Sequence, residues 1–84
     1  MGAAGLSGGM MDDVLLDTCG LLCPLPVLKA RKRLMAMAPG QVLVVRATDR
    51  ASVVDMPHFC FEAGHEYLGL AEEGSVLVHR LRRG

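Results

Sequence analysis

The chain has 84 residues, enough for one small domain that hides only about 60–65% of the surface of its unfolded state. Half of the composition is apolar, which argues against disorder, and nine basic residues balance nine acidic ones. The chain therefore lacks the net positive charge that would attract nucleic acid or an anionic membrane. The longest apolar runs are short, such as Val42 to Val45, whereas a membrane-spanning helix needs about 20 apolar residues.

Residues 1–11 are glycine-rich and carry neither charge nor periodicity. We expect a disordered tail there and a single domain over residues 12–84. No basic segment followed by an apolar stretch marks a secretory signal, so we expect a cytoplasmic protein. In that compartment Cys19, Cys23 and Cys60 would remain free thiols.

The first half of the domain reads as strand, helix and strand. Val14 to Leu16 is a short apolar run that predicts a buried strand. Apolar residues recur with helical spacing from Pro24 to Ala38, and Pro39-Gly40 should end this helix. The β-branched run from Val42 to Ala47 predicts a second, central strand.

The second half predicts a helix followed by a hairpin. Ser52 and Asp55 resemble a capping box, but Pro57 would then interrupt the helix early. We therefore expect Asp55 to be the N-cap of a short helix with Pro57 in its first turn and Gly64 as its terminator.

Two strands should complete the domain, Tyr67 to Ala71 and Val76 to Leu81, joined across a Gly-containing loop. We expect His65 and His79 at the surface of these strands. The order βαβαββ predicts an α+β fold: a two-layer sandwich with two helices on one face of a mixed four-stranded sheet.

Cys23 is the strongest candidate for a reactive residue in this sequence. It precedes Pro24, and the residue before a proline is driven toward the extended backbone that an N-cap residue needs. With Pro24 at the first helical position, Cys23 would lie at the positive end of the helix dipole, where a thiolate is favoured. Pro24 and Pro26 have no N–H, so Leu25 is the nearest helical donor. We therefore predict a mildly acidic, exposed thiol.

The motif Leu16-Asp17-x-x-Gly20-Leu21-x-Cys23-Pro24-x-Pro26 resembles the signature of the TusA/SirA family of sulfur carriers. Asp49, the stretch from Asp55 to Cys60 and Gly64 are similar to a second block of that family. The resemblance spans nearly the whole chain from Leu16 to Arg83. It implies a βαβαββ sandwich and a persulfide on Cys23, with Gly20, Pro24, Pro26 and Asp55 supporting the motif.

The resemblance also implies how such a protein is used. It would be a sulfurtransferase that is more a carrier than a stand-alone enzyme, without cofactor or metal. A cysteine desulfurase or rhodanese would load it, and other relay proteins would receive the sulfur for tRNA thiolation, molybdenum cofactor assembly or sulfur oxidation. We expect Lys29, Lys32 and Arg33 to dock an acidic partner. The protein itself should be a monomer.

Three other interpretations stay open. Cys19 is outside the family motif and could act as a resolving thiol, which would make the chain a Cys19/Cys23 dithiol redox protein. An RNA-binding or regulatory module would use the basic run, although stacking aromatics are scarce. Zinc bound by Cys19, Cys23, His58 and Cys60 fits no familiar ligand spacing. Cys60 is expected in the core instead, on an apolar helical face.

Overall fold

The computed structural model describes residues 12–84, so the expected tail over residues 1–11 lies outside the described part. Six elements follow one another in the predicted order of strands and helices, which confirms the expected βαβαββ arrangement. They are β1 (Val14–Asp17), α2 (Leu25–Met35), β2 (Val42–Ala47), α3 (Ser52–Ala63), β3 (Glu66–Glu73) and β4 (Val76–Arg82).

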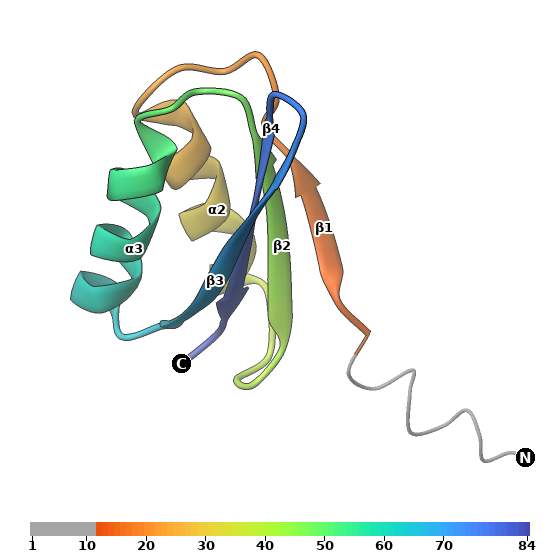
Figure 1. Cartoon of the computed structure of the whole chain (residues 1–84). Helices are drawn as coiled ribbons and strands as arrows, with labels where there is room; N and C mark the ends of the chain where they lie inside the picture. The colour runs from red at the N-terminus through yellow and green to blue at the C-terminus, as the bar shows by residue number, and fades with distance from the viewer. Residues whose placement is uncertain (1–11) are drawn as a thin grey trace, which may run out of the picture.

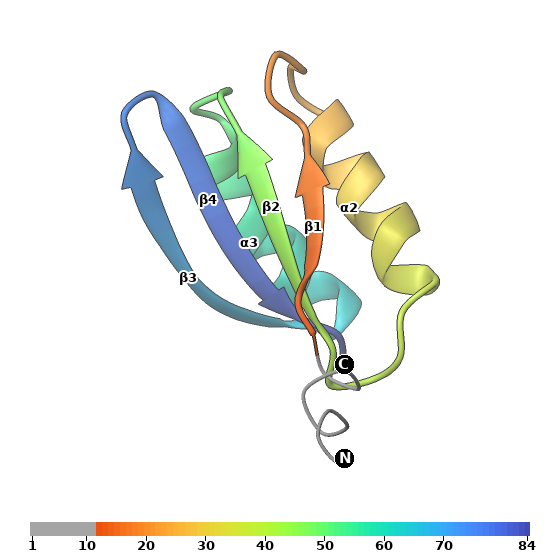
Figure 2. The same cartoon turned by 90° about the vertical axis from the view of Figure 1, so that its right-hand side faces the viewer.

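The four strands form a mixed sheet in the order β1-β2-β4-β3, which Figure 2 shows from its open face. β1 runs parallel to β2, while β4 is antiparallel to both β2 and β3. β2 is therefore a central strand, as its β-branched sequence predicts. This order leaves β1 and β3 as the two edges of the sheet.

Both helices cover the same face of the sheet, as predicted (Figure 1). Alternate residues of β2 and β4 point into this layer and are buried, because side chains along a strand alternate between its two faces. The helices contribute residues at helical spacing to the same core, which contains Ala30, Leu34, Leu43, Val45, Met56, Cys60 and Leu81. Within residues 12–84, neither helix has the length and apolar character needed to cross a bilayer.

The position of His79 contradicts the sequence-based expectation of a surface residue. Its side chain is fully buried, because it occupies the same face of β4 as Leu77 and Leu81. The Nε2 atom lies 2.9 Å from Ser52 Oγ, and Nδ1 lies 2.8 Å from the hydroxyl of Tyr67. The period-two alternation of β4 could have predicted this burial, but the two hydroxyl partners are distant in sequence.

Helix α3 also begins earlier than predicted. It runs from Ser52 through Asp55, which lies in its first turn, and Pro57 is accommodated inside it. The helix can start early because Ser52 N–H donates to the Asp49 carbonyl and the Ser52 hydroxyl contacts His79. A proline at the sixth helical position removes a single backbone hydrogen bond. Asp55 is therefore not the N-cap.

The remaining differences are small shifts of element ends. α2 ends at Met35 rather than Ala38, and the chain tightens afterwards into turns. The hairpin strands are longer than predicted, and only Gly74 and Ser75 connect them. Gly64 ends α3 with φ of 82°, a left-handed conformation that favours glycine, as predicted.

Candidate functional site

The loop from β1 to α2 is fastened to the end of β2 by polar side chains. The backbone N–H and the hydroxyl of Thr18 both donate to the carbonyl of Arg46, at 2.8 and 2.6 Å. Gly20 turns the chain with φ of 86°, a conformation that favours glycine. Its N–H donates to Thr48 Oγ1 at 2.8 Å. These contacts hold the loop that carries Cys23 next to the start of α3.

Cys23 is exposed at the end of this loop, but it is not the N-cap of α2. Pro24 occupies that position, the helix begins at Leu25, and no side chain caps it. The N–H of Leu25 donates to the carbonyl of Leu22 at 2.8 Å. The backbone donor expected to reach the sulfur therefore has another partner. The prediction that the helix terminus activates the thiol is wrong.

The thiol of Cys23 instead donates to a carboxylate on the neighbouring helix. Its Sγ lies 3.0 Å from Oδ2 of Asp55. The hydrogen bond to Asp55 raises the pKa of Cys23 above its ordinary value, and desolvation and the negative charges of Asp55 and Asp49 raise it further. The expected mildly acidic thiol is thus also wrong: the residue is exposed, but its surroundings favour the protonated form.

Asp49 fixes the backbone at the same point. One of its carboxylate oxygens accepts the N–H of Cys23 at 2.7 Å, and the other accepts the N–H of Ala51 at 3.1 Å. These two hydrogen bonds hold the pKa of Asp49 below its usual range. Asp49 thereby joins the loop before α2 to the loop before α3, a role that the sequence alone did not reveal.

The other two cysteines lie in different surroundings. Cys19 is half-buried, and a hydrogen bond between its thiol and Asp17 raises the pKa of the thiol. Cys60 is buried in the core, as predicted, and burial raises the pKa of its thiol to about 11. All three are free thiols. Across residues 12–84, no group of three or more His, Cys, Asp or Glu side chains is arranged to hold a metal ion.

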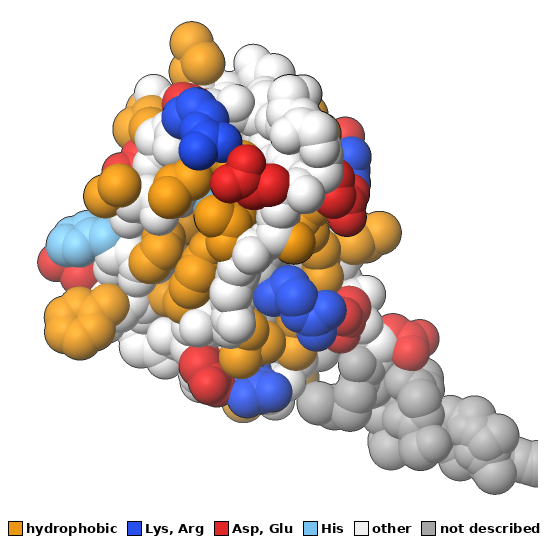
Figure 3. Space-filling model, in the orientation of Figure 1, with side chains coloured by type: hydrophobic (Ala, Val, Ile, Leu, Met, Phe, Trp, Pro, Cys, Tyr) orange, Lys and Arg blue, Asp and Glu red, His pale blue; other side chains and the backbone are white. Residues whose placement is uncertain are grey.

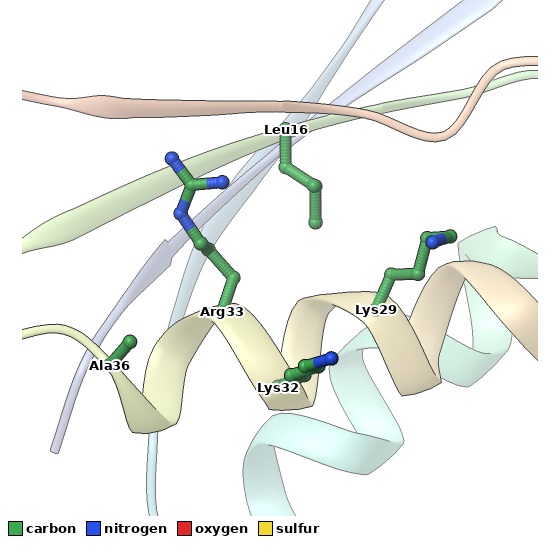
Figure 4. A pocket seen from close by; sticks show the side chains of 5 residues that line it. All are labelled: Leu16, Lys29, Lys32, Arg33 and Ala36. Atoms are coloured by element: carbon green, nitrogen blue, oxygen red, sulfur yellow. The ribbon is translucent and has the colours of Figure 1, made fainter.

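The predicted docking residues come together on one side of α2. Lys29, Lys32 and Arg33 line a hollow of about 280 Å³ between this helix and the edge strand β1. Figure 4 shows Lys29 and Arg33 extending from α2 on either side of Leu16, which reaches down from β1. Leu16 and Ala36 complete the lining, so the hollow joins positive charge to a small apolar floor without an aromatic stacking surface.

Comparison with known proteins agrees with this architecture. The model of the family described as sulfurtransferase TusA matches residues 14–83. The chain belongs to the TusA family. A sulfur carrier protein TusA from Pseudomonas entomophila is 40% identical over 74 residues, covering 88% of this chain and 92% of that protein. Another from Allochromatium vinosum is 52% identical over 62 residues, covering 74% of this chain and 82% of that protein.

Two further proteins, a putative sulfur carrier and a SirA-like protein, broaden the comparison. A putative sulfur carrier protein from Bacillus subtilis, YrkF, is 43% identical over 75 residues, which cover 89% of this chain. This chain spans only 40% of that protein's length. The crystal structure of a SirA-like protein from Desulfitobacterium hafniense superposes with a TM-score of 0.70 at 26% identity, covering 84% of this chain and 97% of that one. It has the same fold as this TusA family member.

Proposed function

We propose that this TusA family member is a sulfur carrier that holds sulfane sulfur as a persulfide on Cys23. The observation that carries the proposal is the placement of this thiol. It is exposed on a loop that hydrogen bonds fix to Thr48 and Asp49, and it is the cysteine of the Cys-Pro motif. A fixed, exposed thiol can meet the reacting sulfur of another protein. The names of the curated relatives support the same function.

Loading requires an attack by the Cys23 sulfur on the outer sulfur of a donor persulfide. A new S–S bond forms at Cys23, the S–S bond in the donor breaks, and the donor sulfur leaves as a thiolate that takes up a proton. Cys23 then carries the persulfide to an acceptor, where the reverse type of exchange releases the sulfur and restores its thiol. These two half-reactions need no cofactor, and the chain serves as a stoichiometric carrier between them.

The partners and location follow from the same proposal. A cysteine desulfurase or a rhodanese would be the donor, and relay proteins of tRNA thiolation, molybdenum cofactor assembly or sulfur oxidation would be acceptors. We propose a cytoplasmic monomer whose carrier domain spans residues 12–84. Lys29, Lys32 and Arg33 would dock an acidic partner beside the loop of Cys23, because α2 begins next to this cysteine.

Intact-protein mass spectrometry tests the carrier proposal directly. The protein is incubated with a cysteine desulfurase and cysteine, or with polysulfide, and compared with C23S, C19S and C60S. We expect a mass gain of one sulfur atom in the wild type, C19S and C60S, and none in C23S. If the wild type gains no sulfur, or forms a Cys19–Cys23 disulfide instead, the dithiol redox interpretation replaces the carrier.

A further inference from the structure

A groove between α2 and α3 opens beside Cys23, on the side of α2 that faces away from β1. It has a volume of about 320 Å³. Its apolar lining consists of Pro24, Val27 and Phe59. Its polar lining consists of Cys23, Asp55, His58 and Glu62. Two exposed leucines, Leu22 and Leu25, flank Cys23 in the chain and add apolar surface near the reacting sulfur.

Carboxylates outnumber basic groups around this groove, and His58 is the basic side chain in its lining. Asp55 and Glu62 belong to its lining, Asp49 holds the backbone of Cys23, and His58 lies 3.4 Å from Glu62. Within residues 12–84, no Lys or Arg forms an ion pair with either aspartate. No Lys or Arg lines the groove either. The thiol therefore faces carboxylates that no Lys or Arg of residues 12–84 pairs with.

This arrangement makes Cys23 a poor nucleophile while the protein is alone. The thiolate, not the thiol, attacks sulfur, and forming it here places a negative charge 3.0 Å from the carboxylate that accepts the thiol hydrogen bond. A cation placed beside Asp55 would offset that repulsion and free the thiol from its acceptor, because opposite charges at short range favour the ionised form. The chain leaves room for such a cation in the groove.

We propose that this groove receives a partner segment carrying an Arg or Lys side chain next to its own reacting cysteine, and that the cation, by pairing with Asp55, makes Cys23 reactive. This inference rests on the proposed carrier function. It gives Asp55 the role of a positioning residue that slows the reaction of Cys23 with other electrophiles until a suitable partner docks. Charge complementarity selects a basic segment, since an acidic one would meet three carboxylates.

Matched peptides test the proposal without an identified partner. Two peptides of equal length carry one cysteine, activated as a mixed disulfide with thionitrobenzoate, beside either Arg or Glu. The Cys23 thiolate attacks the peptide sulfur, a Cys23–peptide disulfide forms, and coloured thionitrobenzoate leaves as the thiolate while the Cys23 proton passes to buffer. C19S/C60S serves as the parent, so that only Cys23 reacts. We expect the Arg peptide to react about fivefold faster at low salt.

The variant D55N should abolish this preference, whereas D12N removes the same charge from an exposed site outside the groove and should retain it. D55N should also react with neutral iodoacetamide about threefold faster near neutral pH, because the gain in thiolate is partly offset by lower intrinsic nucleophilicity. Equal rates for the two peptides in the parent, or an undiminished preference in D55N, would overturn the proposal.

A second measurement does not depend on the folding of D55N. In the parent alone, the advantage of the Arg peptide should shrink as salt is raised from about 0.01 to 1 M, since screening weakens exposed ion pairs. A preference that is independent of salt would contradict an ionic contact. Loading of Cys23 by polysulfide is measured separately by intact mass. A failure of the groove proposal would therefore not contradict the carrier function, and a failure of loading would contradict the carrier function itself.

Discussion

At the scale of single residues, the three thiols of this protein differ mainly in what surrounds them. Cys23 is exposed but donates to Asp55, Cys19 is half-buried beside Asp17, and Cys60 is buried in the core. A thiol reacts through its thiolate and must also be reached by the reagent. Exposure therefore favours Cys23, whereas the charge of the neighbouring carboxylates restrains both Cys23 and Cys19.

This ordering predicts the pattern of alkylation in the folded protein. We expect iodoacetamide at pH 8 to modify Cys23 first and to leave Cys60 unmodified until the protein unfolds. Burial both blocks access to Cys60 and raises its pKa to about 11, so its thiolate is scarce at pH 8. Peptide mapping by mass spectrometry during the reaction measures the order. Modification of Cys60 as fast as Cys23 would contradict the burial described for α3.

Only some properties of Cys23 can be predicted from its neighbours in the sequence. The exposure of Cys23 could be predicted from Pro24 and Pro26, because local backbone restrictions operate between neighbours. The direction in which the pKa of Cys23 is shifted could not be predicted, since Asp55 lies 32 positions further along the chain. The sequence pattern predicts Asp55 as an N-cap and as part of a motif, but its contact with Cys23 depends on the two loops that Asp49 joins.

At the scale of elements, α3 is fastened to the sheet by a buried polar cluster. Ser52 in its first turn contacts His79 on β4, and His79 contacts Tyr67 on β3. A buried polar group that loses its partner destabilises the fold by about 1–3 kcal/mol. The cluster therefore sets the position of the helix turn that carries Asp55. The sequence predicted the existence of both elements from their periodicity, but not this contact between them.

The variant Ser52→Ala tests the importance of the cluster. We expect the free energy of unfolding to fall by about 1–2 kcal/mol, because the substitution leaves Nε2 of His79 without its hydroxyl partner. Chemical denaturation followed by circular dichroism measures the loss. Ser75→Ala, in the exposed turn between β3 and β4, is the matched control and should change stability by no more than about 0.5 kcal/mol. Equal effects of the two substitutions would contradict a structural role for the cluster.

Burial of His79 also predicts how stability depends on pH. Desolvation lowers the pKa of His79 in the folded state below 6.5, its ordinary value, so the unfolded chain binds the proton more readily. Stability from this group is present above pH 6.5 and is lost as pH falls below it. Half-buried His65, whose pKa is also lowered by desolvation and by Arg83, adds to the same trend. His79→Gln should flatten the decline in unfolding free energy between about pH 7 and pH 5, and an unchanged slope would exclude His79 as its source.

At the scale of the whole molecule, one face of the sheet is covered by helices and the other is open (Figures 1 and 2). Figure 3 shows hydrophobic side chains gathered between α3 and the edge strand β3, with charged side chains above and below them. The layered fold could be predicted because apolar periodicity specifies which side of each element is buried. The pairing order of the strands depends on contacts between distant segments.

Helix α2 separates two regions of opposite charge. Toward β1 it presents the hollow of Lys29, Lys32 and Arg33, and toward α3 it borders the groove that contains Asp55 and Glu62. Because α2 begins beside Cys23, the proposed partner would contact both regions while its own sulfur approaches this residue. Charge of alternating sign across one surface restricts the orientations in which a partner can bind productively. Docking and thiol reactivity should therefore be separable by mutation.

Charge reversal in the hollow tests this separation. The double variant K29E/K32E should lower the rate of sulfur loading from a cysteine desulfurase by about tenfold at low salt, since electrostatic steering raises association rates between complementary surfaces. Its reaction with iodoacetamide should change little, because neither lysine lines the groove beside Cys23. Arg31→Glu reverses a charge on the same helix outside the hollow and should have a much smaller effect. Intact mass spectrometry measures the loading rates. If the rates of reaction with the desulfurase and with iodoacetamide fall equally, the lysines act on Cys23 itself rather than on docking.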